Sequence, residues 1–128
     1  MKTILFIPFL FMCSMVIGQS SKIIGKPYRL SKIKVAQYDF PKQMTWYDAK
    51  KACANLGNGW RLPTKDELIL LLKNKDKIGG FASSNCGCNY WSSTEYDGGS
   101  AWYCSFGGGY AGYGNKTNPY HVRAVRAF

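Results

Sequence analysis

Alternation of apolar and polar positions marks the first regular element of the chain. Over residues 33–40 the sequence reads Ile-Lys-Val-Ala-Gln-Tyr-Asp-Phe, a near period of two that is rich in β-branched and aromatic residues. This pattern predicts a strand. Pro41 follows directly and ends it.

A helical period replaces the alternation after Pro41. Thr45 and Asp48 have the spacing of a capping box, with Asp in the position usually held by Glu. Apolar residues then recur three or four positions apart, at Trp46, Ala49, Cys53 and Leu56. The spacing predicts a helix over residues 46–56 that buries this face.

A second helix start follows Pro63. Thr64 and Glu67 form another capping box, and the leucines at 68, 71 and 72 then share one face. The pattern predicts a helix that continues to about Lys75.

Beyond Gly79 and Gly80 the chain becomes rich in aromatic residues, Gly, Ser and Asn. Short strands are predicted at 89–93, 101–106, 110–113 and 120–127. Helices early and strands late are typical of an α+β domain. We expect the last strand to pair with the strand at 33–40, because both would otherwise be unprotected sheet edges.

The start of the chain has the order of a secretory signal peptide. Residues 1–19 run from a Lys through a mostly apolar stretch to Gly18, near which we expect cleavage. A retained membrane anchor is less favoured, because the apolar run is shorter than about 20 residues and contains Pro8. Lipidation at Cys13 is disfavoured because no small residue precedes it. Residues 20–32 are interpreted as a basic linker or arm, and residues 33–128 as the domain.

Charge changes the picture of possible partners. The 128 residues contain 17 Lys and Arg against 7 Asp and Glu, a net charge of +10 in a chain of single-domain length. Peripheral contact of the basic arm with an anionic cell envelope is one hypothesis, and a solvated basic face is the simpler alternative. A nucleic-acid partner is not expected, because the basic and aromatic residues are not interleaved. The first half of the mature chain contains Lys22, Lys26, Arg29, Lys32, Lys34, Lys42, Lys50 and Lys51.

Four cysteines follow the leader, at positions 53, 86, 88 and 104. Export makes disulfides available, and four cysteines allow three pairings. A bridge from Cys86 to Cys88 is disfavoured because a single intervening residue strains its geometry. Cys53 with Cys86 or Cys88 is preferred weakly, and one or more free thiols is an equal alternative. A zinc site is not expected, since no second closely spaced pair exists.

Four phrases carry a family resemblance. They are Met-Thr-Trp-Tyr-Asp-Ala at 44–49, Gly-Trp-Arg-Leu-Pro-Thr-Lys-Asp-Glu-Leu at 59–68, Tyr-Trp-Ser-Ser-Thr-Glu at 90–95 and Val-Arg-Ala-Val-Arg at 122–126. Over residues 33–128 the chain resembles a bacterial C-type-lectin-like family. Within that family it resembles the DUF1566 group and the variable proteins of diversity-generating retroelements. The resemblance implies a C-type-lectin-like fold, with two helices packed on a small twisted antiparallel sheet. Arg61 is then expected to be buried and to support the scaffold by holding backbone carbonyls or a carboxylate such as Glu67.

The stretch from Tyr96 to Thr117 has a biased composition. Nearly every residue is one that an Asn codon can yield when its adenines are replaced, which the resemblance connects with retroelement mutagenesis. Trp102, Phe106 and Lys116 interrupt the bias and are interpreted as scaffold positions. The alternative is an undiversified Gly-rich polar loop. Residues 96–121 are the candidate variable binding region.

Tyrosine provides a rigid amphipathic surface, and Ser, Gly and Asn add adaptable hydrogen bonds, as in antibody paratopes. The predicted ligand-binding residues are therefore the tyrosines of this region, the polar residues around them and the only histidine. They are Tyr96, Asp97, Ser100, Tyr103, Ser105, Tyr110, Tyr113, Asn115, Thr117, Tyr120 and His121.

No catalytic residue, metal or cofactor is expected. His121 has no neighbouring nucleophile in the sequence, and only Glu95 and Asp97 follow Gly80 as acids, too few for a calcium site. The sequence therefore predicts an exported, periplasmic, cell-surface or secreted protein that binds a protein or cell-surface ligand. An undiversified envelope adhesin or structural module is the alternative, and an exported enzyme is third.

Overall fold

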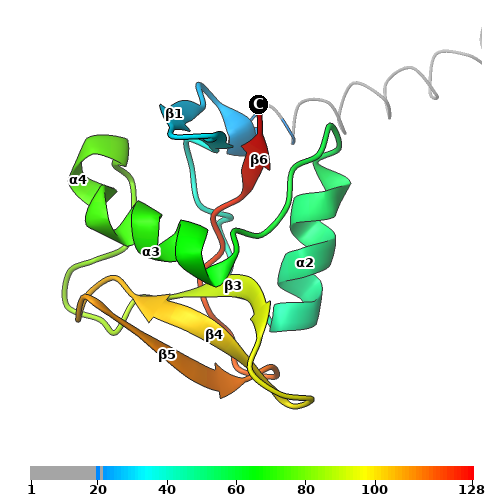
Figure 1. The fold of residues 1–128 in the computed structure, drawn as a ribbon, viewed down its shortest axis with the longest axis vertical. Helices are drawn as coiled ribbons and strands as arrows, with labels where there is room; N and C mark the ends of the chain where they lie inside the picture. Colours follow the sequence, from blue (N-terminus) through cyan, green and yellow to red (C-terminus); the bar gives the residue numbers. More distant parts are fainter. Residues whose placement is uncertain (1–19, 21) are drawn as a thin grey trace, which may run out of the picture.

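The computed structural model describes residues 20 and 22–128 and shows an α+β fold (Figure 1). The predicted signal peptide, residues 1–19, lies outside the described residues. Among residues 20 and 22–128, no helix is long and apolar enough to cross a membrane. In chain order the elements are β1 (Tyr28–Leu30), β2 (Ile33–Val35), α2 (Trp46–Asn55), α3 (Lys65–Lys73), α4 (Lys75–Ile78), β3 (Asn89–Glu95), β4 (Ser100–Ser105), β5 (Tyr110–Asn115) and β6 (Val125–Ala127).

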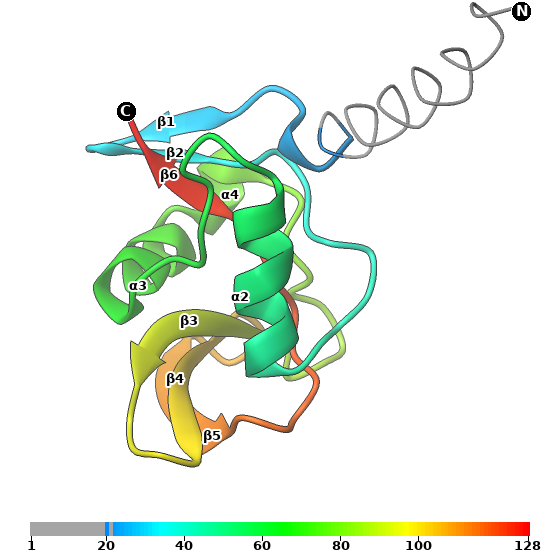
Figure 2. The same ribbon diagram turned by 90° about the vertical axis from the view of Figure 1, so that its right-hand side faces the viewer.

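The strands form two antiparallel sheets of three strands each, in the orders β1-β2-β6 and β3-β4-β5. The sheets lie at opposite ends of the molecule, with α2 and α3 between them in both views (Figures 1 and 2). The expected pairing of the terminal strands is confirmed, since Val35 of β2 lies opposite Val125 of β6. The remaining strands form a sheet of their own, where the sequence suggested one sheet for all of them.

The domain begins earlier than the predicted boundary at residue 33. Strand β1 lies inside the stretch that was interpreted as a linker, and Tyr28 and Leu30 pack against the core below it. The linker prediction is therefore wrong for this strand. The last strand is also shorter than the predicted 120–127, because Tyr120 and His121 form single bridges to Met44 and Tyr90 before β6 begins.

Both helices that the sequence predicts, α2 and α3, begin where the capping residues indicate. The Thr45 hydroxyl accepts a hydrogen bond from the Asp48 amide (3.3 Å) at the start of α2. At α3 the capping box is complete, because Thr64 accepts from the Glu67 amide (3.2 Å) and the Glu67 carboxylate accepts from the Thr64 amide (2.9 Å). These bonds satisfy amides that have no partner within the helix.

Two apolar clusters make up the core, one beside each long helix. The cluster beside α2 contains Trp46, Ala49, Cys53, Trp60, Leu62, Trp91, Ala101, Val122 and Ala124. The cluster beside α3 contains Ile33, Val35, Leu68, Leu71, Cys88, Tyr90, Cys104, Phe106 and Val125. Each sheet thus contributes to the α3 cluster, which joins the two ends of the molecule.

A buried charged network also joins the two ends. The side chain of Arg123 is inaccessible to solvent, and its Nε donates to Asp39 Oδ1 at 2.7 Å. Its Nη1 donates to the carbonyls of Ala36 (3.1 Å) and Gly79 (3.3 Å). The Tyr90 hydroxyl donates to the other oxygen of Asp39. Burial is the main cause that raises the pKa of Tyr90, and the negative charge of Asp39 is the second cause. The hydroxyl therefore keeps the proton that it donates.

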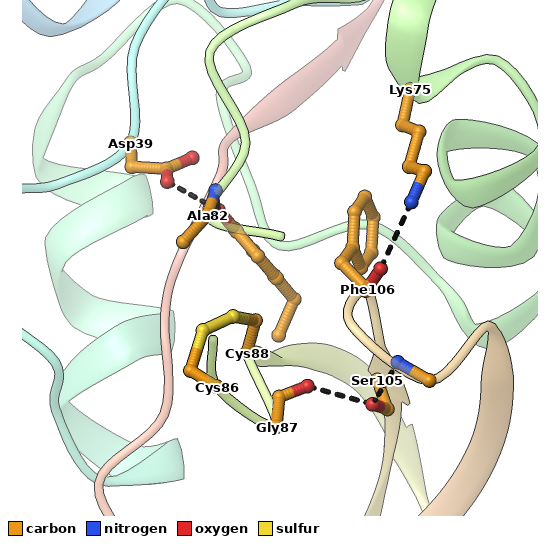
Figure 3. The surroundings of a disulfide bond; sticks show 10 residues. Asp39, Lys75, Ala82, Cys86, Gly87, Cys88, Ser105 and Phe106 are labelled. Atoms are coloured by element: carbon orange, nitrogen blue, oxygen red, sulfur yellow. Dashed lines mark hydrogen bonds between the residues drawn. A yellow bond between two sulfur atoms is a disulfide. The ribbon is translucent and has the colours of Figure 1, made fainter. Parts of the chain in front are cut away.

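The cysteine predictions are corrected by the structure. Cys86 is bonded to Cys88, with 5.1 Å between their Cα atoms (Figure 3). The bridge is accommodated because Cys88 adopts a positive φ of 52°, which turns the chain back across one residue. Cys53 is not paired with either of them, and it lies in the α2 cluster, whereas Cys88 lies in the α3 cluster. Among the described cysteines, Cys53 and Cys104 are free, as the alternative allowed.

Candidate ligand-binding surface

The register of the second sheet divides the predicted tyrosines between two faces. Trp102 of β4 lies opposite Tyr113 of β5, and Tyr103 lies opposite Gly112. Neighbouring residues of a strand point to opposite faces, whereas directly opposed residues share a face. Trp102 and Tyr113 are therefore on one face, and Tyr103 is on the other.

The first face carries an aromatic cluster of Tyr96, Trp102 and Tyr113. The rings of Tyr96 and Tyr113 are stacked in parallel, with centroids 3.8 Å apart, and each meets Trp102 edge-on at 5.6 Å. Both tyrosines are about half exposed, at 49% and 53%. A hydrogen bond with Tyr113 is the main cause that raises the pKa of Tyr96. The cluster is thus an ordered aromatic surface in contact with solvent.

Lys65 extends this cluster, although no sequence pattern pointed to it. Its Nζ lies 3.5 Å from the centroid of the Trp102 ring, a cation–π contact. Lys65 is the first residue of α3, and its amide donates to Thr94 Oγ1 of β3 at 2.9 Å. Trp102 was interpreted as scaffold, but the structure places it half-buried within the exposed cluster.

Lys116 fixes the loop beside the cluster, as expected of a scaffold position. Only 4% of its surface is exposed. Its Nζ donates to the Gly98 carbonyl (3.1 Å), lies 3.6 Å from Glu95 Oε2 and lies 4.4 Å from the centroid of the Trp46 ring. Its amide donates to the Gly99 carbonyl at 2.9 Å. The loop between β3 and β4 is therefore tied to the core.

The tyrosines of the second face mainly pack. Tyr120 contacts Trp91 at 4.3 Å and Tyr103 edge-on at 5.0 Å between ring centroids. Burial raises the pKa of Tyr103. A Cβ added at Gly112 would lie 2.9 Å from the Tyr103 hydroxyl, so a small residue opposite this ring is required. Tyr110 is 55% exposed and stands apart from the aromatic cluster, at the far end of β5.

Ser105 is not available as a ligand contact, and this prediction is wrong. The side chain lies in the interior, with 1% of the residue exposed. Its hydroxyl donates to the Gly87 carbonyl (2.7 Å) and accepts from the Gly108 amide (3.0 Å), which joins β4 to the disulfide loop (Figure 3). Phe106 beside it is also buried, as expected of a scaffold position.

The other polar candidates lie close to the aromatic cluster. Ser100 and Asn115 are opposite each other, two positions along their strands from Trp102 and Tyr113, and so share that face. Asn115 Oδ1 accepts from the Thr117 hydroxyl (2.7 Å) and amide (2.9 Å). Asp97 Oδ1 accepts from the Gly99 amide at 2.9 Å in the exposed loop. These side chains surround the cluster with polar groups.

His121 lies apart from the aromatic cluster. Its backbone bridges Tyr90 on the edge of β3 that faces away from β4, and its ring stacks on Tyr90 with centroids 5.1 Å apart. Among the described residues, no three His, Cys, Asp or Glu side chains are grouped so as to hold a metal ion. The histidine therefore belongs to the packing beside β3.

Arg61 has the scaffold role that was predicted for it. Its guanidinium donates to both oxygens of Glu67, at 2.6 and 3.0 Å, and to the Leu62 carbonyl at 3.2 Å. The bond from Arg61 is the main cause that lowers the pKa of Glu67. The pair is partly exposed rather than buried, and it fixes the turn that precedes α3.

A groove of the described surface lies elsewhere. A groove of about 620 Å³ lies between the start of the described chain and α2, lined by Ile23, Tyr38, Phe40 and Leu56 among others. None of the sequence-predicted site residues lines it. The aromatic cluster does not line this groove, and the exposed rings of Tyr96 and Tyr113 suit a macromolecular surface better than a small molecule.

The fold is C-type-lectin-like. The structure is similar to that of botrocetin, with a TM-score of 0.57 and 11% sequence identity over 81% of this chain and 98% of that chain. A von Willebrand factor (I546V) A1 domain–botrocetin complex gives a TM-score of 0.54 at 12% identity, with the same coverage. At these identities the likeness concerns the fold.

Residues 25–126 match the family model described as the Lcl C-terminal domain, and the chain belongs to this family. The match begins just before β1, in agreement with the earlier start of the fold. No curated protein matches the chain. Membership of the DUF1566 group and the link to retroelements stay predictions from the sequence resemblance.

Proposed function

We propose that this protein is an exported binding module that recognises a protein ligand through the aromatic cluster. The observation that carries the proposal is the exposed stack of Tyr96 and Tyr113 against Trp102. The family and the lectin-like fold support a binding role. Trp and Tyr are the residues most often found at energetically dominant positions of protein interfaces.

A protein ligand fits the dimensions and composition of this surface. A standard interface buries about 800 Å² on each partner, which a small sheet face with its flanking loops can supply. The polar residues around the cluster, at 97, 100, 115 and 117, would form the rim of such an interface. A solved complex of botrocetin with the von Willebrand factor A1 domain gives a precedent for protein recognition on this fold.

A capture experiment tests the proposal. The immobilised chain is exposed to extracts of surface proteins from cells that share its habitat, and retained proteins are identified by mass spectrometry. The double variant Tyr96→Ala/Tyr113→Ala should lower the affinity for the retained ligand by about thirtyfold or more, the loss typical of interface hot spots. The control Tyr38→Ala/Tyr47→Ala removes two equally exposed tyrosines elsewhere and should bind normally. Equal binding by both double variants would refute the assignment of the surface.

Diversification of residues 96–121 is part of the same proposal, and sequencing the locus in sibling isolates tests it. We expect substitutions at template adenines in the codons of surface residues, such as codons 96, 97, 113 and 115. Codons 105, 106 and 116 should stay fixed, because their side chains are buried. Substitutions spread evenly over the gene, with no second copy nearby, would favour the undiversified adhesin or structural module.

A further inference from the structure

Three basic side chains are aligned across the first sheet. Arg29 of β1 lies opposite Lys34 of β2, and Lys34 lies opposite Arg126 of β6. We call Arg29, Lys34 and Arg126 the basic ladder. Directly opposed residues of an antiparallel sheet share a face, and neighbouring strands are about 4.8 Å apart. The three side chains therefore start within about 10 Å of one another on one face.

The ladder faces away from the core. The residues that alternate with it point into the α3 cluster, namely Tyr28, Leu30, Ile33, Val35 and Val125. Among residues 20 and 22–128, no carboxylate lies within the 4.0 Å of an ion pair from any of the three cationic groups. Asp39, the acid that follows β2, is bound to Arg123 instead.

Such an arrangement is unfavourable by itself. Like charges directly opposite each other on neighbouring strands repel and destabilise the sheet. The repulsion is relieved when an anionic surface lies against the ladder. Charge complementarity thus indicates a partner that is extended and negatively charged.

Phe128 distinguishes a membrane from other anionic partners. Its ring is 54% exposed beside the ladder, with the Arg29 guanidinium 4.3 Å and the Lys34 ammonium 5.8 Å from the ring centroid. An exposed aromatic ring surrounded by cations is the composition of interfacial membrane anchors, in which the ring enters the headgroup region and the cations contact lipid phosphates. A soluble polyanion would engage the cations alone, whereas a membrane would also take up the exposed part of the ring.

We propose that the outer face of β1-β2-β6, made of the basic ladder and Phe128, docks on an anionic phospholipid surface. The β3-β4-β5 sheet lies at the opposite end of the molecule (Figures 1 and 2). Docking would therefore direct the aromatic cluster away from the membrane. The basic contact that the sequence suggested for an arm is here assigned to a folded surface.

Sedimentation with sucrose-loaded vesicles tests the proposal. The full chain is mixed with phosphatidylcholine vesicles that contain either no anionic lipid or roughly 30% phosphatidylglycerol. The measured quantity is the affinity for the anionic vesicles divided by the affinity for the neutral vesicles. The apolar run in the predicted leader is common to all variants and to both lipid mixtures, so it cancels in this ratio. Arg29→Gln/Lys34→Gln/Arg126→Gln should lower the ratio about a hundredfold, or about fivefold per side chain. Phe128→Ser should weaken binding to the anionic vesicles at unchanged charge.

The matched control is Lys42→Gln/Lys51→Gln/Lys73→Gln, which removes three exposed charges outside the first sheet. It should retain most of the preference for anionic vesicles. Equal losses in the two triple variants would overturn the proposal, because they would show an effect of net charge alone. The proposal would also be overturned in favour of a soluble polyanion by two results together. Phe128→Ser would bind the anionic vesicles as tightly as the wild type, and the wild type would bind soluble dextran sulfate as tightly as it binds those vesicles. Circular dichroism of each variant establishes that the fold is retained.

Discussion

Replacement of Arg123 by Met should destabilise the protein strongly while leaving the side-chain stem in place. The substitution removes the bond to Asp39 and the bonds to the backbone carbonyls of Ala36 and Gly79. It leaves the Asp39 carboxylate, whose side chain is only 16% exposed, without its cation. Breaking a buried ion pair on one side costs about 3–5 kcal/mol. For a domain of about 100 residues this corresponds to a fall in Tm of about 15 °C.

A double-mutant cycle isolates the pair from general packing effects. Asp39→Asn removes the charge but retains an oxygen that can accept from the Tyr90 hydroxyl. The double variant Arg123→Met/Asp39→Asn should be less destabilised than the sum of the single variants, by about 1–3 kcal/mol. Urea unfolding followed by tryptophan fluorescence measures all four proteins. A loss below 1 kcal/mol in Arg123→Met, or strict additivity in the cycle, would refute the coupling.

Two further predictions follow from the shifted pKa values. The hydrogen bond from Arg61 is the main cause that lowers the pKa of Glu67 in the folded state. The ionised carboxylate therefore contributes fully to stability above the ordinary carboxyl pKa, and this contribution is lost as the pH falls through the folded-state pKa. The Tm of the wild type should therefore decline more steeply below about pH 4.5 than that of Glu67→Gln, and parallel curves would contradict this. Burial raises the pKa of Cys53 to about 12 and that of Cys104 to about 11, so neither should react with iodoacetamide at pH 8 until urea unfolds the chain. Mass spectrometry after alkylation checks this, and labelling at Cys53 or Cys104 in the native protein would show that these thiols are accessible.

Local signals in the sequence were sufficient for α2, α3 and most strands of the fold, but not for the short helix α4. Thr45 and Thr64 begin helices because their capping bonds involve residues only three positions away. Strand β1 was missed because three residues after a Pro and a Gly carry no periodic signal, and it exists only because β2 offers it an edge. The bridge of Cys86 to Cys88 was disfavoured because of its spacing, and Cys88 adopts a positive φ in the bridged loop.

The composition of the binding region could be read from the sequence, but its division into faces could not. Alternation along β4 separates Trp102 from Tyr103, yet the register that brings Tyr113 opposite Trp102 is a long-range property of the hairpin. Lys65 reaches the cluster from a different element altogether. Ser105 looked like a surface hydroxyl because its burial depends on a loop almost 20 residues earlier in the chain, where it bonds Gly87.

The buried position of Lys116 has a consequence for the thermodynamics of recognition. Two of its bonds, to Gly98 and Gly99, hold the loop in place before any ligand arrives, and the stacked rings of Tyr96 and Tyr113 restrict each other in the same way. Immobilising a free side chain on association costs about 0.5–1.5 kcal/mol. A surface that is already rigid avoids much of this entropy loss. Substitutions among its exposed residues can then alter which ligand is bound without each new surface having to become ordered on binding.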